Sequence, residues 1–476
     1  MRVSTVFLGV VALAALASAA AAAEEAPSVA LTVYNDGNAI VRETRSVDVS
    51  KGTGEMRFEE VAATIDPTTV KFRSLSDPDG TVVLEQNFEY DIVSADKLLQ
   101  KYIGKPIAIV TKDGTNYEGT LMSFDGGQIV LAENPEGPLN IIARGDNVKD
   151  ISCSALPEGL ITKPSLLWLL QSAAGGRQMV EVAYSAGGCG WRADYTAVLN
   201  EKDTGLDLSG WVTLTNNSGK TYEKAHLKLI AGEVHRVQQP AMRRAAGAMV
   251  MEKAAEAGRF EEKAFAEYHL YALPRTTTIK DRQIKQIELL SASEVPCEKK
   301  YLFDVMRDFR PYWDQPMTQD YSVGEKGKVQ VFIIFKNDDK SHLGMPLPAG
   351  RVRLFKFDGK DMEFVGEDAI NHTPKDEKLE LLMGNAFDIV GERKRTNFVT
   401  GRGAHWMEES FEITLRNHKK EAVTVDAREH LFRWTNWKIV AKSQDYTKLD
   451  AQTIDFAVDL KPDQEKTVSY TVRYEW

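Results

Sequence analysis

The sequence predicts a mainly β, multidomain protein in which β-sandwich (Ig-like) units accompany a small barrel and one helical or flexible insert. The chain has 476 residues, several times the length of a typical domain, so we expect several separate cores. Short runs of alternating apolar and polar residues recur, divided by Gly, Pro and Asp clusters, which is the pattern of strands and turns. One segment, 240–267, has instead the Ala, Glu, Lys and Arg content of a helix.

Residues 1–23 have the pattern of a cleavable secretory signal. The apolar run from Val6 to Ala17 is too short for a membrane span, and Ala21 to Ala23 provide an A-x-A cleavage site. We therefore expect secretion through a Sec-type signal peptide and a periplasmic or envelope-associated location. No later stretch is long and apolar enough to span a bilayer, so we expect no transmembrane segment after signal cleavage.

The charge balance argues against a nucleic-acid partner. The chain has 59 Lys and Arg against 69 Asp and Glu, a formal net charge of -10, whereas polyanion binding needs a basic surface. Hydrophobic residues make up 43% of the chain, which is enough for several buried cores.

Residues 24–93 are expected to form an N-terminal β domain. Two alternating runs, 31–34 and 39–42, flank the turn residues 35–37, which read Asn-Asp-Gly. This combination predicts a β-hairpin, because such residues adopt the conformations that tight turns require. Further strand-like runs lie at 56–58, 69–72 and 82–84.

Residues 94–157 form a second unit, in which a short amphipathic helix precedes five strand candidates. The candidates are 106–111, 117–124, 128–133, 138–143 and 147–152. This order resembles an Sm-like (Sm/SH3-like) small barrel, and these residues of the Sm motif are present: Gly119, Leu121, Asp125, Leu131, Ile142, Arg144, Gly145 and Val148. Ile129 stands where the Sm family usually carries a base-contacting Asn. The resemblance therefore implies a barrel, or edge-strand pairing, rather than RNA binding.

The remaining chain is expected to form β-sandwiches around one insert. We place a central sandwich at 158–239 and 268–384, the insert at 240–267, and a C-terminal Ig-like sandwich at 385–476. Gly residues interrupt the insert, so it is expected to be a frayed helix or a flexible excursion, which packs on the chain or docks on a partner.

A weak internal repeat runs through these sandwiches. Three alternating runs each end on an Asn followed by a polar turn, at Asn216, Asn337 and Asn417. Asn tolerates the left-handed conformation, so we expect it to turn the chain at the end of each strand.

Several short motifs lie along the chain from residue 182 onward, at 182–184, 191–195, 216–219, 227–229, 347–355, 366–367, 372–374, 384–388 and 413–418. Together they resemble a bacterial exported family, domain of unknown function 4139, related to the mucoidy inhibitor A group. The resemblance implies a β-rich periplasmic or envelope-associated protein. It implies no reaction and no catalytic residues.

Motifs for catalysis, cofactors and metals are almost absent from the sequence. Cys153, Cys189 and Cys297 are too few and too scattered for a disulfide scaffold or a zinc site, although one pair could oxidise after export. No HExxH or GxSxG motif occurs, so no metal or cofactor is expected. Dispersed carboxylates such as Asp194 and Asp388 leave a hydrolase acting on an envelope polymer as an alternative.

Two aromatic clusters are the better candidates for binding. Phe309, Tyr312, Trp313 and Tyr321 lie in a proline-bracketed segment, and rigid aromatic rings are good anchors for proteins or sugar faces. The second cluster contains Trp434 and Trp437. At both clusters, packing against a sandwich core is the competing interpretation.

These observations favour a non-enzymatic protein of the bacterial envelope that binds or scaffolds another envelope protein or a glycan. Besides the hydrolase, a structural homo-oligomer assembled through the small barrel remains an alternative.

Overall fold

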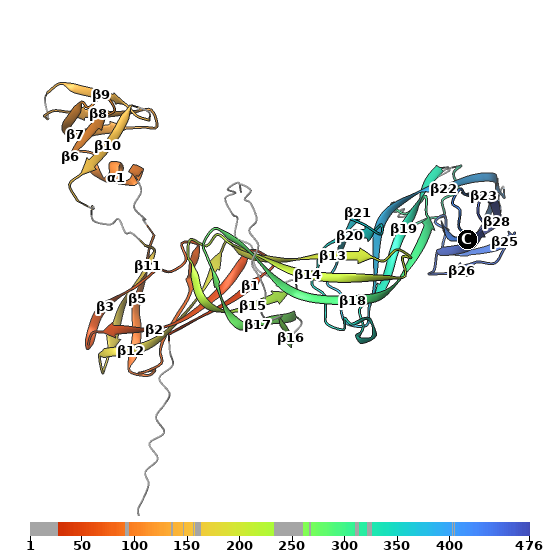
Figure 1. The fold of residues 1–476 in the computed structure, drawn as a ribbon, viewed down its shortest axis with the longest axis horizontal. Coiled ribbons are helices and arrows are strands. Elements are labelled where there is room, and N and C mark those ends of the chain that lie inside the picture. Colours follow the sequence, from red (N-terminus) through yellow and green to blue (C-terminus); the bar gives the residue numbers. More distant parts are fainter. Residues whose placement is uncertain are drawn as a thin grey trace, which may run out of the picture.

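The computed structural model confirms the mainly β, multidomain fold class. The described residues are 27–90, 95–134, 137–145, 147–155, 157, 163–232, 260–265, 268–309, 314–320, 326–401, 403 and 405–476. They contain one α-helix, α1 (Ala95–Tyr102), and four β-sheets, which Figure 1 shows along the chain. The expected signal peptide, 1–23, lies outside the described residues.

Two sheets enclose the first part of the core. The seven-stranded sheet has the order β16-β17-β15-β1-β2-β12-β4, and the three-stranded sheet has the order β3-β11-β5. Their bounds are β1 Ser28–Tyr34, β2 Asn38–Val49, β3 Gly52–Glu59, β4 Ile65–Ser74, β5 Thr81–Glu89, β11 Ser165–Ser172, β12 Gly176–Gly187, β15 Tyr222–Ala231, β16 Glu261–Phe265 and β17 Tyr268–Ile279. The expected hairpin is confirmed, because β1 and β2 pair antiparallel around the turn 35–37.

Strands from residues 24–93 share both sheets with strands from the middle of the chain. β1 pairs in parallel with β15, and β2 pairs with β12. Trp168 of β11 links the two sheets, since its buried ring packs on Phe58 of β3 at 5.7 Å and on Phe72 of β4 at 5.1 Å between centroids. The N-terminal strands thus belong to a core that extends well beyond residue 93.

The small unit contains the predicted helix and the five predicted strands. They are β6 (Pro106–Thr111), β7 (Asn116–Phe124), β8 (Gln128–Ala132), β9 (Leu139–Ala143) and β10 (Val148–Cys153), in the sheet order β10-β6-β7-β8-β9. Gly119 allows β7 to approach β8, because a Cβ at this position would lie 2.5 Å from the Ala132 carbonyl oxygen. Ile129 is fully buried in the core of the unit.

The fourth sheet is thirteen-stranded and holds the rest of the chain together. Its main path is β21-β20-β13-β14-β18-β19-β22-β23-β28-β25, and β24, β26 and β27 join beside it. The bounds are β13 Cys189–Leu199, β14 Gly205–Asn216, β18 Gln283–Phe303, β19 Lys326–Lys336, β20 Gly350–Phe357, β21 Met362–Ile370, β22 Lys378–Thr400, β23 Trp406–Asn417, β24 Val423–His430, β25 Trp437–Lys442, β26 Thr447–Lys448, β27 Thr453–Leu460 and β28 Glu465–Glu475, with a 3₁₀ turn η1 at Asp339–Ser341. Two large cores result: the first includes the two N-terminal sheets, and the second is formed by the C-terminal strands, with buried residues from Tyr301 to Tyr474. β18 and β22 are 21 and 23 residues long and contribute to both large cores.

The repeated Asn residues lie where strands end, since Asn216 and Asn417 close β14 and β23 and Asn337 directly follows β19, but they act differently from what we expected. None of Asn216, Asn337 and Asn417 has a positive φ. Each is buried, and its amide donates to two backbone carbonyls, from 2.8 Å to 3.1 Å in the closest pairs. The expectation of a left-handed Asn was wrong, because the side-chain amide, rather than an unusual backbone angle, holds the turn.

The insert 240–267 falls mostly outside the described residues. Residues 261–265 are described and form β16, which pairs antiparallel with β17 at the edge of the seven-stranded sheet. For these five residues the expectation of a helix was wrong, because the open edge of β17 offers backbone partners that local propensity does not reveal.

Candidate functional site

Of the four predicted binding residues, Phe309 is the one that the structure describes. Tyr312, Trp313 and Tyr321 lie outside the described residues. Phe309 follows the end of β18, where its backbone N–H donates to the Met306 carbonyl at 2.9 Å. Its ring packs edge-on against Phe432, with 5.2 Å between centroids and 80° between planes.

Phe309 borders a cleft of about 710 Å³ next to the second large core. The lining residues are Asp304, Arg307, Phe309, Arg428, His430, Leu431, Phe432, Arg433, Trp434, Thr435, Asp450, Gln452 and Thr453. They come from three parts of the chain: the end of β18, the end of β24 with the segment after it, and the start of β27. We call this the aromatic cleft.

Strand pairing brings the polar residues of the aromatic cleft together. β24 pairs in parallel with β18 and antiparallel with β27, so that His430 stands directly opposite Thr453. His430 Nε2 lies 3.0 Å from the carboxylate of Asp304, whose side chain is 3% exposed. The other ring nitrogen of His430 lies 3.5 Å from the Thr453 hydroxyl. His430 is therefore held between two fixed neighbours.

Arg428 is fixed beside His430 by a bidentate ion pair. Its Nε and one terminal nitrogen donate to the two carboxylate oxygens of Asp455, at 2.8 Å and 2.9 Å. This geometry uses the planar fork of the guanidinium and gives Arg428 a single orientation. The hydrogen bonds from Arg428 to Asp455 raise the pKa of the guanidinium, so the side chain stays charged.

Arg433 anchors residues 314–320, which lie between β18 and β19 in the sequence. It is fully buried, and Nε and Nη2 donate to Glu409 at 2.6 Å and 2.8 Å. Its Nη1 donates to the carbonyl oxygens of Met317 and Gln319, at 2.9 Å and 2.8 Å. One buried side chain thereby ties the described residues 314–320 to the C-terminal core.

The second aromatic cluster packs on the core, and one of its two Trp residues also lines the aromatic cleft. Trp434 and Trp437 both pack against the second core, as the competing interpretation predicted. Trp434 also lines the aromatic cleft, whereas the indole N–H of Trp437 donates to the Ala451 carbonyl at 2.8 Å.

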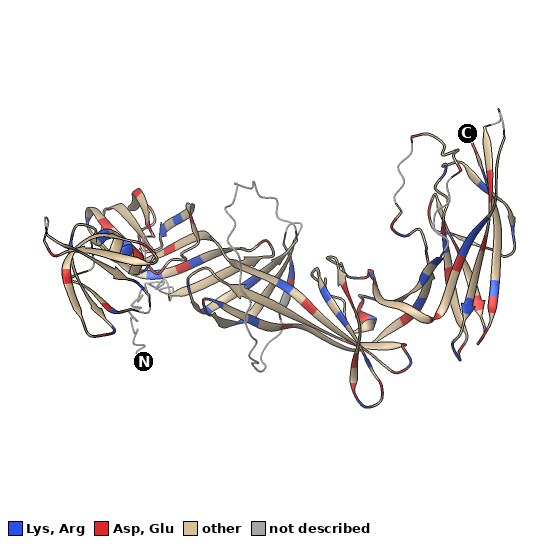
Figure 2. Cartoon of the chain, turned by 90° about the horizontal axis from the view of Figure 1, so that it is seen from above, with Lys and Arg blue, Asp and Glu red and all other residues tan. Residues whose placement is uncertain are grey.

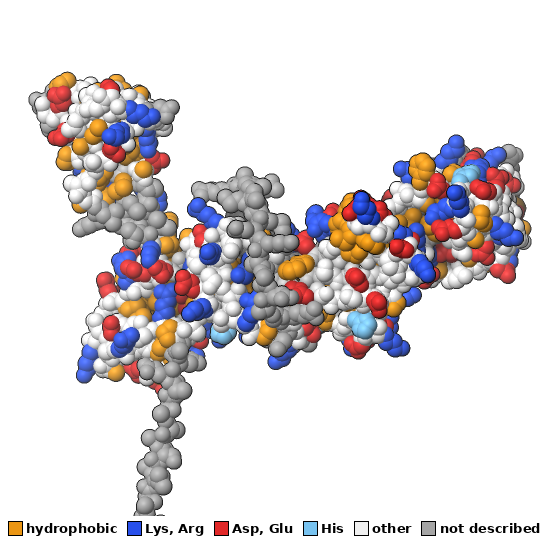
Figure 3. Space-filling view, in the orientation of Figure 1, with side chains coloured by type: hydrophobic (Ala, Val, Ile, Leu, Met, Phe, Trp, Pro, Cys, Tyr) orange, Lys and Arg blue, Asp and Glu red, His pale blue; other side chains and the backbone are white. Residues whose placement is uncertain are grey.

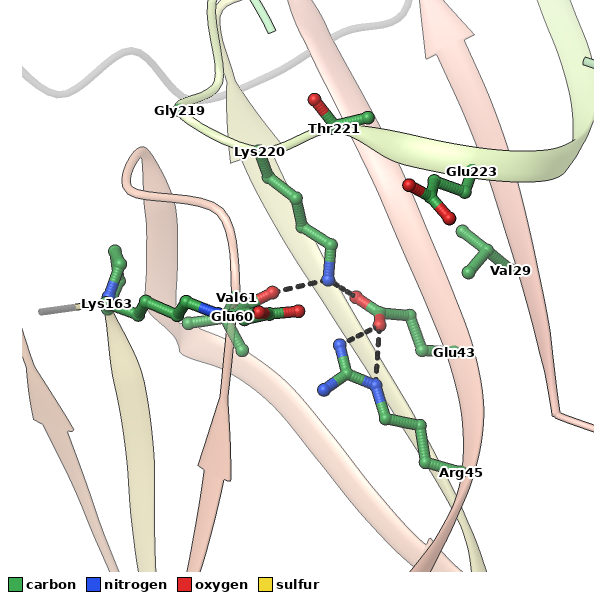
Figure 4. Close-up of a pocket in the computed structure, with 11 residues that line it drawn as sticks. Val29, Glu43, Arg45, Glu60, Val61, Lys163, Gly219, Lys220, Thr221 and Glu223 are labelled. Carbon is green, nitrogen blue, oxygen red and sulfur yellow. Dashed lines mark hydrogen bonds and ion pairs between the residues drawn. The ribbon is translucent and has the colours of Figure 1, made fainter. Parts of the chain in front are cut away.

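A second cleft, of about 670 Å³, lies where β2, the segment before β11 and the turn between β14 and β15 meet. Figure 4 shows Lys220 and Arg45 converging on the carboxylate of Glu43. Lys220 Nζ lies 2.6 Å from Glu43 Oε1, Arg45 Nε donates to Oε2 at 3.0 Å, and the Tyr184 hydroxyl donates to Oε1 at 2.9 Å. We call these four side chains the Glu43 cluster.

The charged groups of the Glu43 cluster form ion pairs with one another. Burial alone would raise the pKa of Glu43, which is 1% exposed, but Lys220 and Arg45 outweigh it and hold the pKa below its ordinary value. At the mouth of this cleft, Lys163 pairs with Glu60. Because the buried carboxylate already has three donors, the cluster joins strands rather than offering a vacant ligand site.

The other residues that the sequence suggested for chemistry lie apart or are already engaged. Asp194 accepts from Thr213 at 2.7 Å and from Arg192 at 3.1 Å, while Asp388 is exposed on β22. Neither carboxylate lines the aromatic cleft. The thiols of Cys153, Cys189 and Cys297 are free.

Outside the two clefts, an exposed hydrophobic patch is visible on the surface. Figure 3 shows hydrophobic side chains gathered over β20 and β21, where Phe357, Met362 and Phe364 are 40%, 58% and 57% exposed. Within the described part of the chain, no three His, Cys, Asp or Glu side chains gather as metal ligands would, and no helix is long and apolar enough to cross a bilayer.

The sheets and the aromatic cleft define a class of protein: a mainly β chain of several sheets with its candidate binding site in the C-terminal part. Residues 180–476 match the family described as Domain of unknown function (DUF4139), which is more than half of the chain, so the protein belongs to that family. Residues 97–127 are similar to the LSM domain, over most of α1 together with β6 and β7. Searches of curated proteins and of solved structures found no match.

Sequence reasoning identified Phe309 but missed the polar residues of the aromatic cleft. Asp304, Arg428 and His430 stand at strand ends far apart in sequence, and no local pattern marks them. Glu43 did carry a signal. It continues the inward phase of Ala39 and Val41 in an alternating strand, which indicates a buried charge that needs a partner.

Proposed function

We propose that this protein is an exported, non-enzymatic binding or scaffolding protein of the bacterial envelope, and that it holds an envelope protein or a glycan in the aromatic cleft. The signal-like residues 1–23 support the location, and the motifs quoted above support a relation to the mucoidy inhibitor A group. The observation that carries the proposal is the cleft itself. Its size is typical of ligand pockets, and aromatic rings stand beside fixed polar groups.

The engagement of the titratable groups supports binding rather than catalysis. Asp304 is nearly fully buried, and it accepts from the Met306 backbone N–H at 3.0 Å as well as holding His430. A general base must reach a proton of the substrate. The carboxylate of Asp304 is instead occupied in fixing the end of β18 and the His430 ring.

Photo-cross-linking in cells tests the proposal. A photoreactive amino acid replaces Thr435, which is exposed and lines the aromatic cleft, and in a matched control it replaces Lys51, exposed in a distant turn. We expect an envelope protein or glycan adduct from position 435 and not from 51, and Phe309→Ala should weaken it. Identical adduct patterns at both positions would contradict the proposed site.

These substitutions separate loss of binding from loss of folding better than a deletion of the whole segment 307–322 would. Such a deletion would also take away the Met317 and Gln319 carbonyls that accept from Arg433. A buried guanidinium without its acceptors destabilises the core, so loss of binding would then follow from misfolding.

The alternative of a homo-oligomer assembled through the small barrel has one observation in its favour. Leu139 and Ile141, on the edge strand β9, are 59% and 67% exposed. Exposed apolar edge strands pair with other chains. The mass of the leaderless chain across a wide concentration range tests this alternative, with Ile141→Lys as the variant that should dissociate any oligomer.

A further inference from the structure

The aromatic cleft contains polar groups that the described chain leaves unused. Within the described residues, the indole N–H of Trp434, the second terminal nitrogen of Arg428 and the amide oxygen of Gln452 have no hydrogen-bond partner, although other atoms of Arg428 and Gln452 do. Two of these groups are donors and one is an acceptor. A ligand that engages all three groups must therefore both accept and donate hydrogen bonds.

The charges around the aromatic cleft are balanced. Arg428 is paired with Asp455, Arg433 with Glu409, and His430 with Asp304, and the two other charged residues that line the cleft, Arg307 and Asp450, are of opposite sign. Figure 2 shows the same interspersion of positive and negative residues along the C-terminal strands. A polyanion gains most of its affinity from an excess of positive charge, and this cleft offers none. The ligand class that matches is neutral.

The backbone at the cleft argues against an extended peptide as the ligand. A peptide that adds to a sheet needs a strand with unpaired N–H and C=O groups. β24 pairs with β27 up to His430 and Thr453 at the cleft, whereas its pairing with β18 ends at Ala427, which leaves residues 428–430 without a described strand partner on that side. Three residues give an added strand few backbone hydrogen bonds, so recognition at this site relies mainly on side chains.

We propose that the aromatic cleft binds a neutral glycan, with a sugar ring lying on Trp434 and its hydroxyls hydrogen-bonded by Arg428 and Gln452. Each hydroxyl both donates and accepts, which matches the mixed set of unused groups. The apolar C–H face of a pyranose covers an aromatic ring, which releases water from both surfaces. This inference rests on the proposed binding function and adds the chemical class of the ligand.

Titration of the full leaderless chain with neutral and charged oligosaccharides tests the inference. The probes are chitohexaose, maltohexaose and cellohexaose, with oligogalacturonate as the anionic comparison, followed by calorimetry. We expect at least one neutral probe to bind, and Trp434→Ala to weaken it by about tenfold or more, as loss of an aromatic anchor does. Trp211→Ala, on a 39% exposed Trp of β14, is the matched control and should leave the affinity unchanged.

A second variant guards against misfolding of Trp434→Ala, because Trp434 also packs on the core. Thr435→Arg changes an exposed residue and should block the cleft while the thermal midpoint stays constant. Failure of every neutral probe to bind, or tighter binding of oligogalacturonate, overturns the inference. A protein adduct from position 435 in that case would leave the proposed binding function standing, and the absence of any adduct would remove both.

Discussion

The Glu43 cluster gives the sharpest stability prediction. Lys220→Met removes the ammonium that lies 2.6 Å from the buried carboxylate, while an unbranched side chain of similar length still fills the space. The side chain of Lys220 is 9% exposed, so little water can take its place. Glu43 keeps the Arg45 and Tyr184 hydrogen bonds but loses a direct positive partner.

The expected loss follows from the burial of the pair. Removing one partner of a buried ion pair typically costs about 3–5 kcal/mol, and the two donors that remain at Glu43 place this case lower, at about 2–3 kcal/mol. Replacing both partners, as in Glu43→Gln with Lys220→Met, should recover most of this loss, to within about 1 kcal/mol of the original chain, because the charge that remains, Arg45, is 29% exposed and can be hydrated.

Hydrogen exchange with mass spectrometry is the appropriate assay, since it reports local opening free energies in a chain with several cores. Peptides covering β2 and β15 should lose protection in Lys220→Met, while peptides of β23 and β28 stay unchanged. Lys163→Met is the matched control: its side chain is 50% exposed and its pair with Glu60 lies at the surface, so its effect on protection should be much smaller than that of Lys220→Met. Equal protection in Lys220→Met and the original chain would refute the reasoning, and so would a double variant as weak as the single one.

Three further predictions concern acid, the buried arginine and one thiol. The pKa of Glu43 in the folded chain lies below its ordinary value of 4.5, so the ionised carboxylate contributes to stability above pH 4.5 and this contribution is lost as the pH falls further. Hydrogen-exchange protection of β2 should therefore decrease on acidification below pH 4.5, and it should decrease less in Glu43→Gln. Arg433→Lys cannot keep the forked pair with Glu409 and should lower the stability of the C-terminal core by about 2–4 kcal/mol in thermal unfolding, whereas Arg416→Lys at the surface should have little effect. Burial raises the pKa of Cys189 to about 11, so the thiol should resist maleimide at pH near 8 until urea unfolds the chain.

Each of these predictions has a contradicting result. Identical acid profiles for the original chain and Glu43→Gln would show that other carboxyls control the opening of β2. A thermal midpoint that Arg433→Lys leaves unchanged would mean that a single ammonium can hold the segment 314–320. Rapid labelling of Cys189 in the folded chain would indicate that this part of the core opens readily.

Local pattern predicted the small unit best. Its five strands fall within one residue of the expected bounds at nearly every end, because Gly, Asp and Asn turns delimit each short alternating run. The hairpin around 35–37 was predicted equally well, for the same reason. In these places the information that decides the structure lies within a few residues of sequence.

Long-range pairing could not be predicted from the sequence. β1 lies between β2, its neighbour in sequence, and β15, which begins at Tyr222. The partners Glu43 and Lys220 stand 177 residues apart. Alternation shows which residues face inward but not which strand stands opposite, so the residues that complete a buried ion pair or a cleft stay hidden until the strands are paired.

The candidate site was predicted in part for a related reason. An aromatic cluster is visible as composition, so Phe309 was predicted as a binding residue and Trp434 was noted, although packing was the favoured interpretation of Trp434. The fixed polar groups beside them depend on β18, β24 and β27 meeting at their ends. Side chains such as His430 acquire a role only from that meeting.

The two longest strands have a mechanical consequence. β18 and β22 each run from one large core into the other, with local bulges such as the one at Glu294 of β18, so the junction contains mostly hydrogen-bonded strand backbone instead of a linker. A force applied to the C-terminal strands would act along the length of β18 and β22. The rows of hydrogen bonds that join these two strands to β19 would share that force. The junction should therefore behave as a stiff strut that keeps a bound object at a set distance from the N-terminal sheets.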